Sequence, residues 1–93
     1  MTKDEKIDYT LLALYKSTKD GGMLSIIEAF NENNQELELE ELKEIKYKLE
    51  IKQFAVFQVE KMDYRGQILD KGKEFVETTS FSDQNKSILE LEE

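Results

Sequence analysis

The chain has 93 residues, of which 39% are hydrophobic and 37% charged, and its formal net charge is −8 at pH 7. This length predicts one domain, and apolar residues that recur in periodic groups argue against disorder throughout the chain. The absence of cysteine and histidine excludes disulfides, thiolate or imidazole metal sites and nucleophiles activated by histidine. No apolar run approaches the roughly 20 residues of a membrane span, and no signal peptide is recognisable, so we expect a soluble cytoplasmic protein.

The first predicted element is a helix in KDEKIDYTLLALYKSTKDGG, which begins at residue 3. Its apolar face is formed by Ile7, Leu11, Leu14 and Tyr15, which follow helical spacing. The pair Gly21-Gly22 ends it, because glycine accepts the left-handed conformation that a helix end needs. A glycine pair can also belong to a phosphate-binding loop, but no Lys-Ser/Thr follows this one.

A short second helix is predicted in MLSIIEAFNENN. Ser25 and Glu28 have the spacing of a capping box, in which each side chain accepts a hydrogen bond from the other's backbone N–H. Met23 and Leu24 then form a short extended entry, and the asparagines that follow Phe30 end the helix.

The segment LELEELKEIKYKLEIKQF is predicted to form a third helix with a core stripe of Leu42, Ile45 and Leu49. Strict alternation in ELELE would also suit a strand, but the helical spacing that follows favours a helix. The next segment, FAVFQVEKMDYRGQILD, predicts a hairpin whose chain returns from Met62 to Gly66, with Gly66 as the permissive turn residue.

The hairpin is followed by a helix in DKGKEFVETTSF, with Asp70 as its predicted N-cap and with Phe75 and Val76 facing inward. Residues 80–93 form an acidic C-terminal tail or short helix, for which Ser82 is the predicted cap. Two interpretations of this tail stay open: a frayed terminus and a helix that forms a dimer.

This order of elements resembles the winged helix-turn-helix family over roughly residues 7–78. The passage LKEIKYKLEIKQFAVFQVE resembles a recognition helix that runs into a wing. ILDKGKEFVE is similar to the Leu-Thr-x-Lys-Gly segment of bacterial regulators of the multiple-antibiotic-resistance and phenolic-acid-response types. The sequence departs from the family pattern at Gln53, where glycine is usual, at Lys46, where an apolar residue is common, and at Asp70, which replaces threonine.

The resemblance implies an α+β fold of the winged helix-turn-helix type. We expect a three-helix core with a two-stranded β-wing and a C-terminal helix in residues 1–79, followed by the tail. It also implies a DNA-binding transcription regulator, with the third helix in the major groove and the wing on the backbone or minor groove. The partner would be double-stranded DNA, bound by a homodimer.

The side of the third helix opposite its core stripe is predicted to carry the site. We expect Lys43, Tyr47 and Lys48 to contact the groove, and Lys61, Arg65 and Lys73 to contact phosphates. Residues 43–73 support this because they hold eight basic and five acidic residues, whereas the rest of the chain is acidic. Two carboxylates on the same side, Glu40 and Glu44, oppose it because they repel phosphate.

Arg65, the only arginine, is placed at the wing tip. It is either a minor-groove or phosphate contact, or a solvated turn residue paired with Asp63.

An alternative function uses the same side of the third helix. Tyr47 and Ile51 form an outward apolar strip inside a charged rim, which is typical of a protein-binding patch for a second copy or another protein. The competing interpretation is that Ile51 turns inward toward the wing. We expect no enzyme, because the carboxylates Glu40 and Glu44 lie on a solvated face and no nucleophile or base can be named. We expect no cofactor and no metal, since NENNQE lacks the spacing of a calcium loop.

Overall fold

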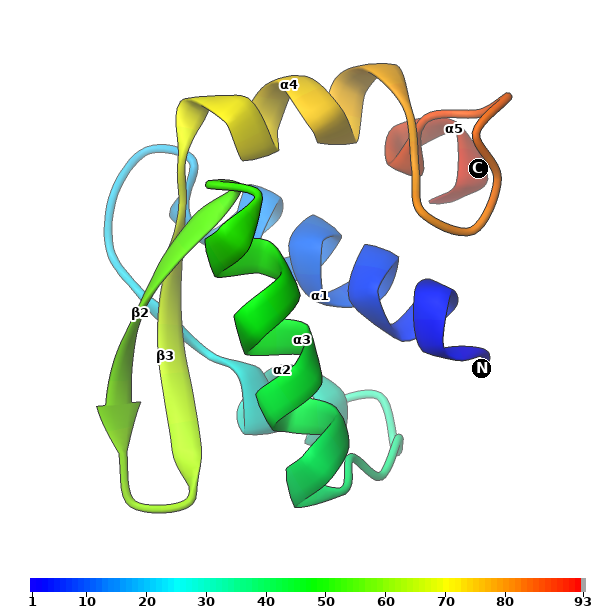
Figure 1. The fold of residues 1–93 in the computed structure, drawn as a ribbon. Helices are drawn as coiled ribbons and strands as arrows, with labels where there is room; N and C mark the ends of the chain where they lie inside the picture. The colour runs from blue at the N-terminus through cyan, green and yellow to red at the C-terminus, as the bar shows by residue number, and fades with distance from the viewer. Residues whose placement is uncertain (93) are drawn as a thin grey trace.

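The computed structural model describes residues 1–92 and shows an α+β protein with a three-stranded antiparallel sheet (Figure 1). In chain order the elements of this range are α1 (Lys3–Thr18), β1 (Leu24–Ser25), α2 (Ile26–Asn31), α3 (Leu39–Ile51), β2 (Ala55–Glu60), β3 (Asp63–Ile68), α4 (Asp70–Thr78) and α5 (Ile88–Glu92). None of these helices is long and apolar enough to span a membrane.

The sheet has the strand order β1-β3-β2. β3 pairs with β2 over six residue pairs, from Ala55 opposite Ile68 to Glu60 opposite Asp63. Its other edge pairs with β1 through Leu24 opposite Gly66 and Ser25 opposite Arg65. β3 is therefore the central strand, and β2 has one free edge.

The core lies where α1, α2, α3 and α4 meet the sheet. Its fully buried side chains include Leu11 and Leu14 of α1, Phe30 of α2, Leu42 and Leu49 of α3, and Val76 of α4. The predicted core stripe of the third helix is confirmed, since Ile45 is buried as well. In Figure 1, α1 runs behind α3 and beneath α4, so it contacts most of the other elements.

The predicted cap of the second helix is confirmed in one direction: the backbone N–H of Glu28 donates to Ser25 Oγ at 3.2 Å. The Ser25 hydroxyl in turn donates to the carboxylate of Asp63, at the start of β3. The same carboxylate accepts from the backbone N–H of Ile27 at 3.3 Å. Asp63 therefore joins the hairpin to the start of α2.

The predicted turn of the hairpin is wrong. The chain reverses at Lys61 and Met62, where Met62 has a φ of 57°, and Gly66 lies inside β3. A Cβ at Gly66 would lie 2.6 Å from Cε1 of Phe57, so glycine is needed there because the Phe57 ring lies against the strand. Arg65 consequently belongs to β3 and not to the tip of the hairpin.

The prediction that Asp70 is the N-cap of the fourth helix is also wrong. Asp70 is the first helical residue of α4, and the N-cap is Leu69, which makes no capping bond through its side chain. The Asp70 carboxylate instead lies 3.7 Å from Lys73 Nζ.

α3 ends at a residue in the left-handed conformation, Gln53, which has a φ of 61°. The Gln53 N–H donates to the Glu50 carbonyl at 3.0 Å, and the Phe54 N–H donates to the Leu49 carbonyl at 2.9 Å. This pair of bonds is a Schellman motif, in which the residue after the C-cap is left-handed and usually glycine.

The C-terminal segment packs on the domain itself. Ile88 is 2% exposed and belongs to the same core cluster as Leu11 and Val76. Ser82 does not cap α5: its hydroxyl and backbone N–H donate to Asp8 of α1. Ser87 is the residue that caps α5, since its Oγ accepts from the Glu90 N–H at 3.1 Å.

We expect Gly72→Ala to lower the free energy of unfolding by about 1–3 kcal/mol. A Cβ at this position would lie 2.2 Å from the carbonyl oxygen of Phe54, so α4 or the base of the hairpin must move. Urea unfolding measures the change. Glu74→Ala, at an exposed position of the same helix, is the control, and equal effects of the two substitutions would contradict the contact.

We expect Gln53→Gly to raise the free energy of unfolding by roughly 0.5–1 kcal/mol, because glycine adopts a positive φ without the cost that a side chain brings. The gain is reduced by loss of the bond from Lys71 Nζ to Gln53 Oε1, which is 2.9 Å long. The control is Lys52→Gly, because Lys52 has a φ of −83° and gains nothing from glycine. Destabilisation of the same size by both substitutions would contradict the Schellman end.

Candidate functional site

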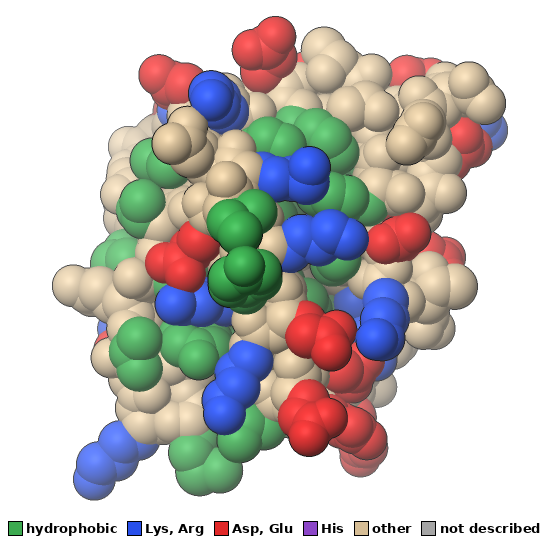
Figure 2. Space-filling model, viewed as in Figure 1, with side chains coloured by type: hydrophobic (Ala, Val, Ile, Leu, Met, Phe, Trp, Pro, Cys, Tyr) green, Lys and Arg blue, Asp and Glu red, His purple; other side chains and the backbone are tan. Residues whose placement is uncertain are grey.

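The outward side of α3 carries two large apolar side chains that the fold leaves uncovered. Tyr47 is 64% exposed and Ile51 is 62% exposed. They are four residues apart on one helix, so they are neighbours on its surface. In Figure 2, hydrophobic side chains stand out near the middle of this face, with basic and acidic side chains around them. The interpretation in which Ile51 turns inward is wrong, and the two side chains form one strip, which we call the α3 strip.

The opposite side of the same helix fixes the direction of the α3 strip. Leu42, Ile45 and Leu49 are buried against the core. At the N-terminal end of α3, the Lys6 ammonium donates to the Glu41 carboxylate and so joins α3 to α1. This hydrogen bond lowers the pKa of Glu41, and a second bond from the Glu38 backbone N–H lowers it further.

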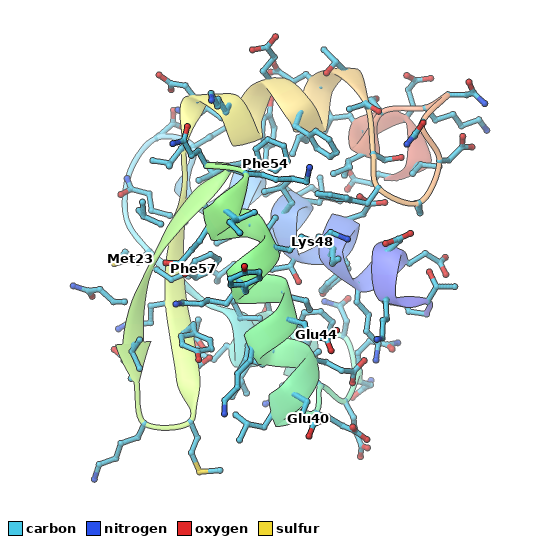
Figure 3. The ribbon with its side chains drawn as sticks, viewed as in Figure 1. Met23, Glu40, Glu44, Lys48, Phe54 and Phe57 are labelled. Carbon is cyan, nitrogen blue, oxygen red and sulfur yellow. The ribbon has the colours of Figure 1, made fainter. Side chains whose placement is uncertain are left out.

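Charged side chains line the flanks of the α3 strip. Figure 3 shows Glu40, Glu44 and Lys48 along one flank of α3. Glu44 lies 3.5 Å from Lys3 of α1. On the other flank, Lys46 Nζ lies 2.6 Å from Glu50 and 5.4 Å from the centre of the Tyr64 ring. The rim therefore contains both signs of charge, with carboxylates close to the exposed tyrosine.

The residues predicted to contact DNA are distributed over α3, the hairpin and α4. Lys43 and Lys61 are exposed, whereas Lys48 is half-buried with its Nζ 5.4 Å from the centre of the Phe81 ring. Arg65 lies 3.6 Å from Glu60, so its expected pairing with Asp63 is wrong.

Lys73 lies 3.7 Å from Asp70 at the start of α4, at the opposite end of the hairpin from Lys61 (Figure 1). On the face shown in Figure 2, basic side chains are interspersed with acidic and apolar ones.

A second group of exposed apolar side chains, which was not predicted from the sequence, lies on the hairpin. Val56, Val59 and Met62 are 44%, 72% and 74% exposed. The sequence feature that indicates this group is the uncharged run Ala-Val-Phe-Gln-Val at the start of β2, because edge strands usually carry charges. Beside this end of β2 is a shallow hollow, lined by Glu50, Gln53, Ala55, Val56, Leu69, Asp70 and Lys71.

Within residues 1–92, no three acidic side chains gather in a way that could hold a metal ion. Comparison with known proteins gives no family: no protein-family model, no curated protein and no solved structure matches this chain. The surface of α3 and of the hairpin is therefore the basis on which a function can be argued.

We expect Glu41→Gln to lower the free energy of unfolding at pH 7 by roughly 1 kcal/mol or less, the range of partly exposed ion pairs. Because the pKa of Glu41 is lower in the folded chain than the unfolded value of about 4.3, this stability is present above that pH. It is lost as the pH falls through the folded pKa.

The measurement is urea unfolding of both proteins from neutral pH down to acid. Glu40→Gln is the control, since it removes the same charge one residue earlier and breaks no bond to Lys6. A difference between wild type and Glu41→Gln that stays constant with pH would contradict this assignment.

Proposed function

We propose that the chain is a winged-helix domain whose α3 surface binds another protein. Support for the fold comes from the chain order of α1, β1, α2 and α3, followed by the β2–β3 hairpin and α4. In this arrangement, α3 is packed on its inner side and open to solvent on its outer side. The family resemblance of the sequence points to the same helix as the contact element.

The main support for protein binding is that the α3 strip is exposed to solvent. Tyr47 and Ile51 leave more than half of their surface in water, whereas Leu42, Ile45 and Leu49 of the same helix are buried. Covering such side chains contributes on the order of 1–2 kcal/mol each. Tyrosine at the centre of a patch with a charged rim is a typical binding hot spot.

Charge favours a protein partner over a nucleic acid. α3 itself has four glutamates and three lysines, and the whole chain has a formal net charge of −8. A duplex placed against α3 would bring phosphates toward Glu40 and Glu44, and both carboxylates would repel them. A protein partner with basic groups at its rim meets no such penalty.

DNA binding is the second candidate, and one observation favours it. Lys43 on α3 and Lys61 at the hairpin turn are exposed, and neither has an ion-pair partner within residues 1–92. A helix and a hairpin that each present a free lysine suit a groove contact and a backbone contact on one duplex.

The protein-binding proposal is tested with the double variant Tyr47→Ser/Ile51→Ser, compared with wild type by affinity purification from cells that express the chain. We expect proteins retained by the wild type to fall at least about tenfold with the variant, the effect of losing roughly 1.4 kcal/mol. Leu91→Ser is the matched control, because it removes an apolar side chain of α5 that is 40% exposed. If the double variant retains the same proteins at the same level as Leu91→Ser, the proposal fails.

The two candidates are separated by titrating a mixed-sequence duplex at about 50 mM salt and following fluorescence anisotropy. Protein binding through the α3 strip predicts no saturable DNA binding. Saturable binding that weakens steeply with salt and with Lys43→Ala would favour the second candidate instead.

A further inference from the structure

The free edge of β2 is a second surface, separate from the α3 strip and independent of the function proposed above. The backbone N–H of Leu69 donates to the Phe54 carbonyl at 2.9 Å, so Phe54 and Leu69 are a hydrogen-bonded pair of the β2–β3 ladder. This pair shows which residues of β2 direct their backbone groups toward β3. In an antiparallel ladder, alternate residues then direct their N–H and C=O groups toward the partner strand. Val56, Gln58 and Glu60 therefore face β3, whereas the N–H and C=O groups of residues 55, 57 and 59 point away from it.

The two outer edges of the sheet differ in how well they are closed. On the β1 side, the N–H of Ile68 in β3 donates to Thr18 Oγ1 at 2.9 Å. α1 therefore supplies a hydrogen-bond acceptor to β3 beyond the end of the short β1 pairing. On the β2 side, no helix or strand of the described range covers the edge (Figure 1). Five residues of this edge, Ala-Val-Phe-Gln-Val, carry no charge, proline or glycine. Charged side chains and proline on an edge strand usually prevent it from pairing with another chain.

We propose that β2 pairs antiparallel with β2 of a second copy of this chain, so that two sheets join across a twofold axis. The residues with free backbone groups define the register, with Phe57 opposite Phe57 and Ala55 opposite Val59. Val56 then lies opposite Gln58. No charged residue faces a like charge in this pairing, since Glu60 falls opposite Phe54. An isologous contact of this kind satisfies both edges at once.

Charge and shape at the end of the hairpin support a second copy as the occupant. Antiparallel pairing brings the partner's turn, with Lys61 and the exposed Met62, to the start of β2. The hollow at that end is lined by two carboxylates and one lysine, Glu50, Asp70 and Lys71. Within the chain, Glu50 also lies 2.6 Å from Lys46 and Asp70 lies 3.7 Å from Lys73. By symmetry, the contact between the turn of one copy and the hollow of the other occurs twice. The pairing also covers Val59, which is 72% exposed in the single chain.

The first test is sedimentation equilibrium across about 10–500 μM, the range in which an interface of small size dissociates. We expect a monomer–dimer equilibrium that Val59→Lys weakens at least about tenfold, because it places a charge opposite Ala55 of the partner. Gln67→Lys is the control, since Gln67 is on β3 and its strand has both edges paired. A wild type that stays monomeric throughout, or a dimer unaffected by Val59→Lys, overturns the proposal.

The second test determines the register by disulfide formation between introduced cysteines, because the chain has no cysteine of its own. Val56 and Gln58 would face each other as a non-hydrogen-bonded pair, about 4.5 Å between Cα atoms, which is within disulfide range. Val56→Cys mixed with Gln58→Cys is expected to form the mixed disulfide in preference to either self-disulfide. Val56→Cys mixed with Lys86→Cys is the control for random collision. A mixed yield no higher than in the control, or a predominant self-disulfide, overturns this register.

Discussion

Phe54 is the residue on which the arrangement of the protein depends. Its N–H donates to the Leu49 carbonyl and ends α3, and its carbonyl accepts from Leu69 and closes the base of the hairpin. Its ring lies 4.6 Å from the Phe75 ring and 6.1 Å from the Phe81 ring, measured between centroids. Gly72 lets α4 approach the same carbonyl closely. One residue therefore connects a helix end, a strand pair and the closing helix, and the direction of the α3 strip follows from it.

Much of the fold could be predicted because local patterns and tertiary packing agree. The core stripe of α3 and the cap at Ser25 depend on residues close in sequence. The turn and the last cap could not be predicted in the same way. Gly66 resembles a turn residue in the sequence, but glycine is required there by Phe57 from the neighbouring strand. Ser82 resembles a cap, but it is held by Asp8, 74 residues away in the chain.

The candidate site was predictable in part for a similar reason. Helical periodicity alone places Tyr47 and Ile51 opposite the core stripe, and both are exposed. Periodicity gives no information on contacts between distant elements, so it could not show that Lys48 lies over the Phe81 ring. It also could not show the free edge of β2, because an edge is defined by the order of strands in the sheet.

The role of Phe54 is tested most directly by amide hydrogen exchange resolved by residue, in dilute monomeric protein. The N–H groups of Phe54 and Leu69 are both bonded at the junction, so we expect them to exchange as slowly as the amides of α1. Exchange of these two amides as fast as that of Lys61 and Met62 would show that the junction opens independently of the core. Such a result would contradict a fixed hairpin and a fixed direction of the α3 strip.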